Sequence, residues 1–143
     1  MIIAVGIDMV EISRVERLIV SKGDHALRKL FTDAERAYAA SRPRPALHFA
    51  ARVAAKEATY KALRGTHEAR AIGWRELEVT LEWDGAPTLV LHGGAAKRAI
   101  ELGVTRIHLS MTHTASSAAA VSVLEGPGKS PESENFTFAG ARK

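Results

Sequence analysis

The stretch Arg52-Val-Ala-Ala-Lys-Glu-Ala-Thr-Tyr-Lys61 lies in an alanine-rich segment that decides how this chain folds. Between Ala46 and Arg64 there are 7 alanines in 19 residues, with no glycine or proline, so the segment is predicted to be one long helix. Its apolar positions recur every three or four residues and form a narrow stripe of mostly small side chains: Leu47, Ala51, Ala54, Ala58 and Ala62. A sheet or another helix can therefore pack closely against this helix.

Charged residues occupy other faces of the same predicted helix. Glu57 and Lys61 are four residues apart and share a face, with Arg64 one turn further on, while Arg52 and Lys56 form a neighbouring basic row. We interpret the carboxylate with its cations as half of a magnesium and phosphate site. The alternative is a solvent-exposed face with an ordinary i,i+4 ion pair, which stabilises a helix by only ~0.2–0.5 kcal/mol.

Length and composition indicate one globular domain. The chain has 143 residues, of which 46% are hydrophobic and 25% charged, enough to bury a core of its own. It has no cysteine, which excludes disulfides and thiol chemistry and fits a cytoplasmic protein. The longest apolar run, Ala118–Leu124, is far shorter than the ~20 residues that span a bilayer, and no export signal precedes the first strand. We therefore expect no membrane association.

The net charge of +4 and a pI near 9.7 indicate an anionic partner. A nucleic acid, a phosphorylated cofactor or an acidic protein would each fit. Aromatic residues make up only 6% of the chain and are not interleaved with the basic residues, so a base-stacking surface for nucleic acid is not favoured.

Hydrophobic periodicity predicts the remaining elements. Strands are expected at 2–8, 77–82, 88–92, 105–112 and 118–124, and helices at 13–21, 24–30, about 32–41 and 95–102. Ser13 is the expected N-cap of the first helix, and Gly23 is expected to stop it. Strands 77–82 and 88–92 form a hairpin around Asp84-Gly85, whereas 65–73 is expected to be a loop. Residues 1–125 form the predicted domain and 126–143 a flexible tail.

Polar residues also occur at the ends of two of the predicted strands, 2–8 and 105–112. Gly6 and Asp8 share one face of the first strand, and the missing side chain at Gly6 would let a ligand approach the carboxylate. Alternatively, Asp8 simply ends the strand. Ser110 and Thr112 lie on the polar face of strand 105–112, which is followed by His113, either a functional histidine or a hydrogen-bonded surface residue.

Three blocks of sequence together resemble the holo-[acyl-carrier-protein] synthase family, the small bacterial 4′-phosphopantetheinyl transferases. The blocks are Gly6-Ile-Asp-Met-Val-Glu-Ile12, Arg52-Val-Ala-Ala-Lys-Glu-Ala-Thr-Tyr-Lys-Ala62 and His108-Leu-Ser-Met-Thr-His-Thr114. The similarity extends from about residue 2 to residue 125. The chain departs from the family pattern at Val53, where an aromatic residue is usual, at Thr112, where serine is common, and at Thr114, where an acidic residue is often found.

This resemblance implies transfer of the phosphopantetheine arm of coenzyme A to a serine of apo acyl carrier protein, with release of adenosine 3′,5′-bisphosphate. It implies Mg²⁺ held by Asp8 and Glu57, a requirement that matches the preference of Mg²⁺ for one or two protein carboxylates. For the base that deprotonates the acceptor serine, we favour Glu57 acting through a metal-bound water, with His113 second.

The resemblance also implies roles for basic and hydroxyl side chains. Contacts to coenzyme A are expected from seven residues: Arg42, Arg44, Arg52, Lys61, Ser110, Thr112 and His113. Lys61 and His113 are also expected to take part in catalysis near the pyrophosphate. Arg14 and Arg17 are the candidates for docking the acidic recognition helix of the carrier protein.

The implied fold is α+β, an antiparallel sheet packed on a long helix, assembled as a homotrimer with active sites between subunits. Two other functions stay open from the sequence alone. A basic nucleic-acid-binding module would bind in a salt-sensitive way without needing Asp8 or Glu57. A non-catalytic coenzyme A or nucleotide binder would need Arg52 and Lys61 but not both carboxylates.

Overall fold

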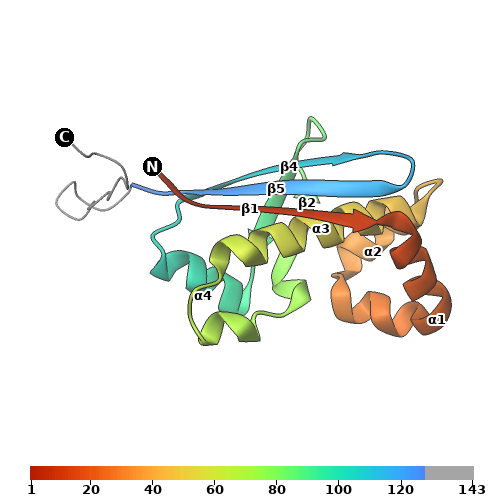
Figure 1. Ribbon diagram of the computed structural model, residues 1–143, viewed down its shortest axis with the longest axis horizontal. Helices are drawn as coiled ribbons and strands as arrows, with labels where there is room; N and C mark the ends of the chain where they lie inside the picture. Colours follow the sequence, from red (N-terminus) through yellow and green to blue (C-terminus); the bar gives the residue numbers. More distant parts are fainter. Residues whose placement is uncertain (128–143) are drawn as a thin grey trace, which may run out of the picture.

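The computed structural model describes residues 1–127 (Figure 1). In chain order the elements are β1 (Ile2–Glu11), α1 (Ile12–Leu30), α2 (Asp33–Ala40), α3 (Pro45–Leu63), two 3₁₀ turns (Glu68–Ala71 and Trp74–Glu76), β2 (Leu77–Leu81), β3 (Pro87–Leu91), α4 (Gly93–Glu101), β4 (Arg106–His113) and β5 (Ser117–Glu125). The predicted tail, 126–143, falls almost entirely outside the described residues, so the tail and the domain boundary at 125 stay predictions.

An antiparallel sheet and a long helix dominate the fold, which confirms the predicted α+β class. The sheet has the strand order β1-β5-β4, and β2 and β3 form a separate antiparallel hairpin. Helix α3 runs beneath the sheet, with the other helices arranged around it (Figure 1). The predicted hairpin is present, and its pairs run from Leu77 opposite Leu91 to Leu81 opposite Pro87.

Close packing of β1 on α3 depends on residues without bulky side chains. The predicted stripe on α3 is buried, with Ala54 and Ala58 at 0% exposure. At Gly6 a Cβ atom would lie 1.7 Å from the carbonyl oxygen of Ala58, which no real contact allows. The glycine and the alanines therefore set the distance between strand and helix, and with it the position of Asp8 relative to α3.

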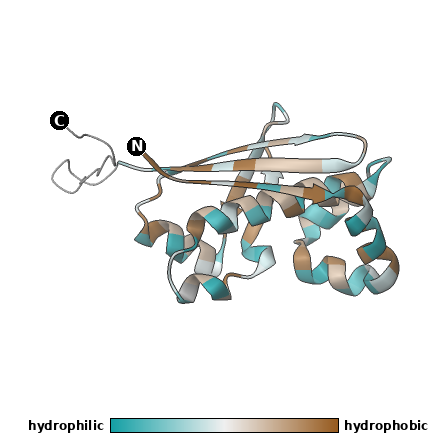
Figure 2. Cartoon of the chain, in the orientation of Figure 1, coloured by the Kyte–Doolittle hydropathy of each residue, from teal (hydrophilic) through white to brown (hydrophobic). Residues whose placement is uncertain are grey.

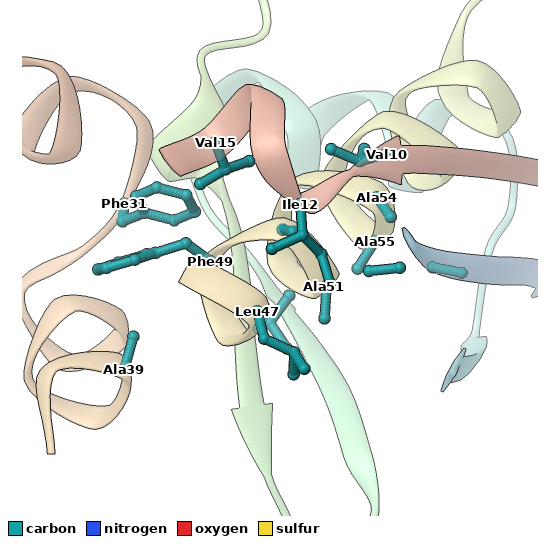
Figure 3. Packing of buried hydrophobic residues seen from close by; sticks show 14 of the residues in the cluster. Val10, Ile12, Val15, Phe31, Ala39, Leu47, Phe49, Ala51, Ala54 and Ala55 are labelled. Carbon is teal, nitrogen blue, oxygen red and sulfur yellow. The ribbon is translucent and has the colours of Figure 1, made fainter. Parts of the chain in front are cut away.

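The core divides into two clusters on either side of this crossing. One gathers the end of β1, the start of α1 and the first half of α3, where the rings of Phe31 and Phe49 lie 4.7 Å apart between centroids (Figure 3). The other joins the end of α3 to β2, β5 and α4, with Leu63 and Leu124 fully buried. Both ends of α3 are thus anchored.

The N-terminal helices differ from the prediction in their capping. Helix α1 begins at Ile12 with Glu11 at the N-cap position and no side-chain cap, so the predicted cap by Ser13 is wrong. Gly23, with φ of 57° and ψ of −144°, interrupts the helical geometry as predicted, so α1 consists of two helical segments separated by a kink at this glycine. Thr32 caps α2 and forms a reciprocal capping box with Glu35. The predicted loop 65–73 contains a 3₁₀ turn, so that prediction is partly wrong.

The outer face of the sheet carries exposed apolar side chains. Val5, Ile7 and Met9 on β1 are 57%, 64% and 68% exposed, because Gly6, Asp8 and Val10 occupy the face that packs on α3. Figure 2 shows hydrophobic segments along β1. An apolar strip this exposed usually marks a contact surface.

Candidate active site

Asp8 and Lys61 meet where β1 crosses α3. The Lys61 ammonium donates hydrogen bonds to the Asp8 carboxylate, at 2.7 Å between Nζ and Oδ1, and to the carbonyl oxygen of Ile7, at 3.0 Å. The Asp8 side chain is 18% exposed and that of Lys61 40% exposed, so the pair is reachable from solvent. Asp8 is therefore not a simple strand terminator: β1 continues to Glu11 beyond it.

Glu57 lies one helical turn before Lys61 on the same face of α3 and borders a pocket of about 230 Å³. The other lining residues come from α3 and from the segment after it: Lys56, Tyr60, Arg70, Ile72, Gly73, Trp74 and Leu77. Glu57 is only half-buried. Its carboxylate can thus act on a ligand while its backbone stays fixed in the helix.

A second pocket, of about 240 Å³, contains other predicted site residues. Arg52, Thr112 and His113 line it, together with Tyr38 and His48, which the sequence analysis missed. The Arg52 guanidinium lies over the Tyr38 ring, 4.3 Å from its centroid, and that of Arg42 lies 4.4 Å from the same centroid. Stacking on an aromatic face fixes a guanidinium plane without using up its N–H donors.

This second pocket is electropositive. Arg52 is only 2% exposed, and its Nε finds no hydrogen-bond partner within residues 1–127. Burial lowers the pKa of His48, and the positive charges of Arg52, Arg42 and His113 lower it further. Burial also lowers the pKa of Arg52 itself. A buried guanidinium donor with no partner, on the same aromatic ring as a second guanidinium, is what an anion such as phosphate would satisfy.

The remaining predicted residues lie at the surface. Arg14 and Arg17 are exposed on α1, Arg42 is exposed after α2, and Ser110 is exposed on β4. Arg44 donates a long hydrogen bond of 3.4 Å to the carbonyl oxygen of Ala115. In one chain, then, Glu57 lines one pocket, whereas Arg52, Thr112 and His113 line another.

Lys56 is the clearest correction to the predicted basic row. Its side chain is 0% exposed and forms an ion pair of 2.8 Å with Glu35, so it does not belong to a solvated face of the helix. The exposed-face alternative also fails for Arg52. Sequence periodicity places Lys56 beside Arg52 but cannot reveal that Glu35, 21 residues earlier, meets it.

Comparison with known proteins decides the family. The 4′-phosphopantetheinyl transferase superfamily model matches residues 4–122. The chain belongs to this superfamily. Among curated relatives, the holo-[acyl-carrier-protein] synthase of Anaeromyxobacter dehalogenans strain 2CP-1 is 44% identical over 131 residues, covering 90% of this chain and 99% of the relative. The synthase of Moorella thermoacetica is 46% identical over 120 residues, covering 84% of this chain and 91% of its own.

Solved structures agree with the superfamily fold. The acyl carrier protein synthase of Mycobacterium tuberculosis is 34% identical, with a TM-score of 0.66 over 89% of this chain and 100% of its own. The holo-(acyl-carrier-protein) synthase of Bacillus anthracis, solved in complex with CoA (3′,5′-ADP), is 30% identical, with a TM-score of 0.70 over 88% of this chain and 98% of its own. The chain thus spans nearly the whole length of these transferases.

Within residues 1–127, no three Asp, Glu or His side chains gather into a group that could enclose a metal ion. No helix of that part is long and apolar enough to cross a membrane.

Proposed function

We propose that this chain transfers the 4′-phosphopantetheine arm of coenzyme A to a serine of apo acyl carrier protein, giving holo acyl carrier protein and adenosine 3′,5′-bisphosphate. The observation that carries the proposal is the identity of 44% with a holo-[acyl-carrier-protein] synthase along 99% of that relative. Neither a nucleic-acid-binding module nor a non-catalytic binder has such support. The lack of cysteine fits a cytoplasmic location for the reaction.

In this reaction the serine oxygen forms a new bond to the phosphorus next to the pantetheine arm. The bond from that phosphorus to the adenosine bisphosphate breaks, and the serine proton passes to a base. We assign Glu57 as the base because its carboxylate lines a pocket on a rigid helix, and His113 as the second candidate. Lys61 supplies a cation for the pyrophosphate charge.

Asp8 and Glu57 are the proposed Mg²⁺ ligands, and the donor set fits this ion. Mg²⁺ is commonly held by only one or two carboxylates and completes its octahedron with water and phosphate oxygens, so no closed cage is needed. The Asp8 carboxylate already attracts a cation, since Lys61 lies 2.7 Å from it. When bound, the ion would neutralise charge on the pyrophosphate.

The pocket around Arg52 is the proposed site for a phosphate of the coenzyme. Thr112 and His113 line it, and Arg42 lies on the same Tyr38 ring as Arg52. Arg44 and Ser110 are proposed to add contacts from the surface. A phosphate bound in this pocket is expected to raise the pKa of His48, because its negative charge would offset the positive charges that lower this pKa. NMR titration of the His48 ring with and without 3′,5′-ADP checks this. The ring signals of His25, exposed on α1, are the control and should not respond to 3′,5′-ADP, and an unchanged pKa of His48 at saturation would contradict the assignment.

Arg14 and Arg17 on the exposed surface of α1 are proposed to dock the acidic carrier protein. Reversing both charges in Arg14→Glu/Arg17→Glu is expected to raise the KM for carrier protein by about tenfold or more, with kcat nearly unchanged, because rim charges chiefly steer association. Steady-state kinetics at two salt concentrations measure the effect, which should shrink at high salt. Lys97→Glu on α4, which reverses one charge instead of two, is the control, and half of the double variant's effect on log KM there would show that only net charge matters.

A homotrimer is proposed to bury the apolar outer face of the sheet, with Val5, Ile7 and Met9 at its centre. It would also allow the Glu57 pocket of one subunit to act beside the Arg52 pocket of another. Light scattering is expected to give three times the 15.4 kDa of one chain. A monomeric mass at working concentration would contradict this assembly.

The deciding experiment incubates the chain with coenzyme A, Mg²⁺ and apo acyl carrier protein and measures the carrier protein by mass spectrometry. A mass gain equal to the phosphopantetheine arm, located on a serine, supports the proposed function. No gain with a carrier protein that a known synthase modifies in parallel would reject it.

A further inference from the structure

A fully buried ion pair lies next to the Glu57 pocket. Lys56 on α3 and Glu35 on α2 are each 0% exposed in their side chains, and Nζ lies 2.8 Å from Oε1. An ammonium group has three N–H donors, and all three are used here. Besides Glu35, Lys56 donates to the carbonyl oxygens of Trp74, at 2.9 Å, and Leu77, at 2.7 Å.

Glu35 extends this network to two other segments. Its Oε1 also accepts a hydrogen bond from the backbone N–H of Thr32, at 2.9 Å, and its Oε2 accepts one from the N–H of Val79, at 3.1 Å. The two side chains therefore join the start of α2, the middle of α3, the 3₁₀ turn at Trp74–Glu76 and strand β2. No donor of the ammonium group and neither oxygen of the carboxylate is left unpaired.

Stability alone is a weak explanation for such a pair. Removing two charges from water is costly, and well-packed apolar residues of similar size commonly stabilise a fold as well or better. Burial does lower the pKa of Lys56, although the Glu35 carboxylate opposes that shift. The hydrogen bonds that Lys56 donates, in contrast, fix the positions of two carbonyl groups, which apolar side chains cannot do.

Those two carbonyl groups belong to residues that line the Glu57 pocket. Trp74 and Leu77 form part of its wall, Lys56 lines it as well, and Glu57 follows Lys56 directly on α3. The same ammonium group thus links the helix that carries Glu57 to both ends of the turn that faces it.

We propose that Lys56, held by Glu35, is a positioning residue for the transferase: it sets the Trp74–Leu77 wall against Glu57 and so fixes the geometry of the reacting pocket. This inference rests on the proposed function for its kinetic consequence. The position of the Trp74–Leu77 wall can be measured without enzymatic turnover.

The test compares Lys56→Met and the double variant Glu35→Leu/Lys56→Met with the wild type. Both variants are expected to lower kcat by about tenfold or more, with KM for carrier protein within about twofold, because misplacing a catalytic group costs rate rather than docking. The double variant, which leaves no lone buried charge, is expected to keep a Tm close to that of the wild type.

Trp74 gives a direct readout of the wall. The chain has two tryptophans, and Trp83 is 97% exposed, so Trp83→Phe leaves Trp74 as the only reporter. In that background, acrylamide quenching of Trp74 should increase in the double variant. Val15→Ala, a buried core change on α1, is the control and should lower Tm without changing kcat or Trp74 quenching.

Unchanged kcat in a folded double variant, or unchanged Trp74 quenching with a rate that falls only as Tm falls, would overturn the inference. If the wild-type chain transfers no phosphopantetheine, the proposed function fails instead. The Trp74 measurement then still decides whether Lys56 positions the wall.

Discussion

Glu57→Gln is expected to lower kcat by roughly 100-fold or more, because a positioned general base contributes about 10²–10⁴-fold to rate. The amide keeps the size of the side chain but removes the charge that accepts the serine proton and that is proposed to hold Mg²⁺. Glu57 is half-buried and forms no ion pair or side-chain hydrogen bond with any other of residues 1–127, so the fold should not change. Single-turnover formation of holo acyl carrier protein, followed by mass spectrometry, measures the loss.

Two comparisons make this result specific. Glu101→Gln, on the exposed side of α4, removes the same charge and should leave kcat unchanged. His113→Gln separates the two candidate bases, since it should reduce kcat less than Glu57→Gln does. If Glu57→Gln keeps more than half of the wild-type kcat at saturating Mg²⁺, Glu57 is neither base nor ligand, and the assignment passes to His113.

The long helix and most strands could be predicted because their signals are local. Seven alanines without glycine or proline favour a helix at 46–64, and the structure has one at Pro45–Leu63. Alternation at 77–82 and 88–92 around Asp84-Gly85 predicts the hairpin that the structure forms from β2 and β3. These patterns depend on backbone propensity and on side-chain period, which neighbours in sequence already determine.

The buried face of a strand and a buried ion pair are harder to predict from the sequence, because both depend on contacts between residues that are far apart in the chain. In β1, apolar residues predominate on the exposed face, and a glycine and an aspartate face the helix, the reverse of a simple amphipathic strand. The sequence predicts that Lys56 belongs to a basic row on the surface of the helix, whereas in the structure it forms a buried ion pair with Glu35. Glu35 also accepts a hydrogen bond from the backbone of Val79, a contact across 44 residues that no local pattern predicts.

The two groups of candidate site residues also show where sequence reasoning ends. Resemblance named Asp8, Glu57 and Lys61 together with Arg52 and His113 as one site. In a single chain, Lys61 pairs with Asp8, whereas Arg52 and His113 line a separate pocket. The proposed homotrimer would bring the two groups together across subunits, and the exposed sheet face proposed to form it is marked by no motif.

Gly6→Ala is the substitution expected to destabilise the fold most. The added Cβ would lie 1.7 Å from the carbonyl oxygen and 2.7 Å from the carbonyl carbon of Ala58. Both are backbone atoms of a buried helix, so no side-chain rotation can relieve the overlap. Strand and helix must separate, and overpacking of this kind costs about 3 kcal/mol or more of unfolding free energy. Urea denaturation followed by circular dichroism measures it.

The matched control is Gly73→Ala, where φ is −81° and the nearest atom to a new Cβ is 3.9 Å away. Its unfolding free energy should stay within about 0.5–1 kcal/mol of the wild type, since alanine fits that conformation. If Gly6→Ala were as stable as this control, β1 would not cross α3 as closely as described. Asp8, whose place beside Lys61 depends on that crossing, would then lose its position relative to Glu57, and the proposed metal site would lose its structural basis.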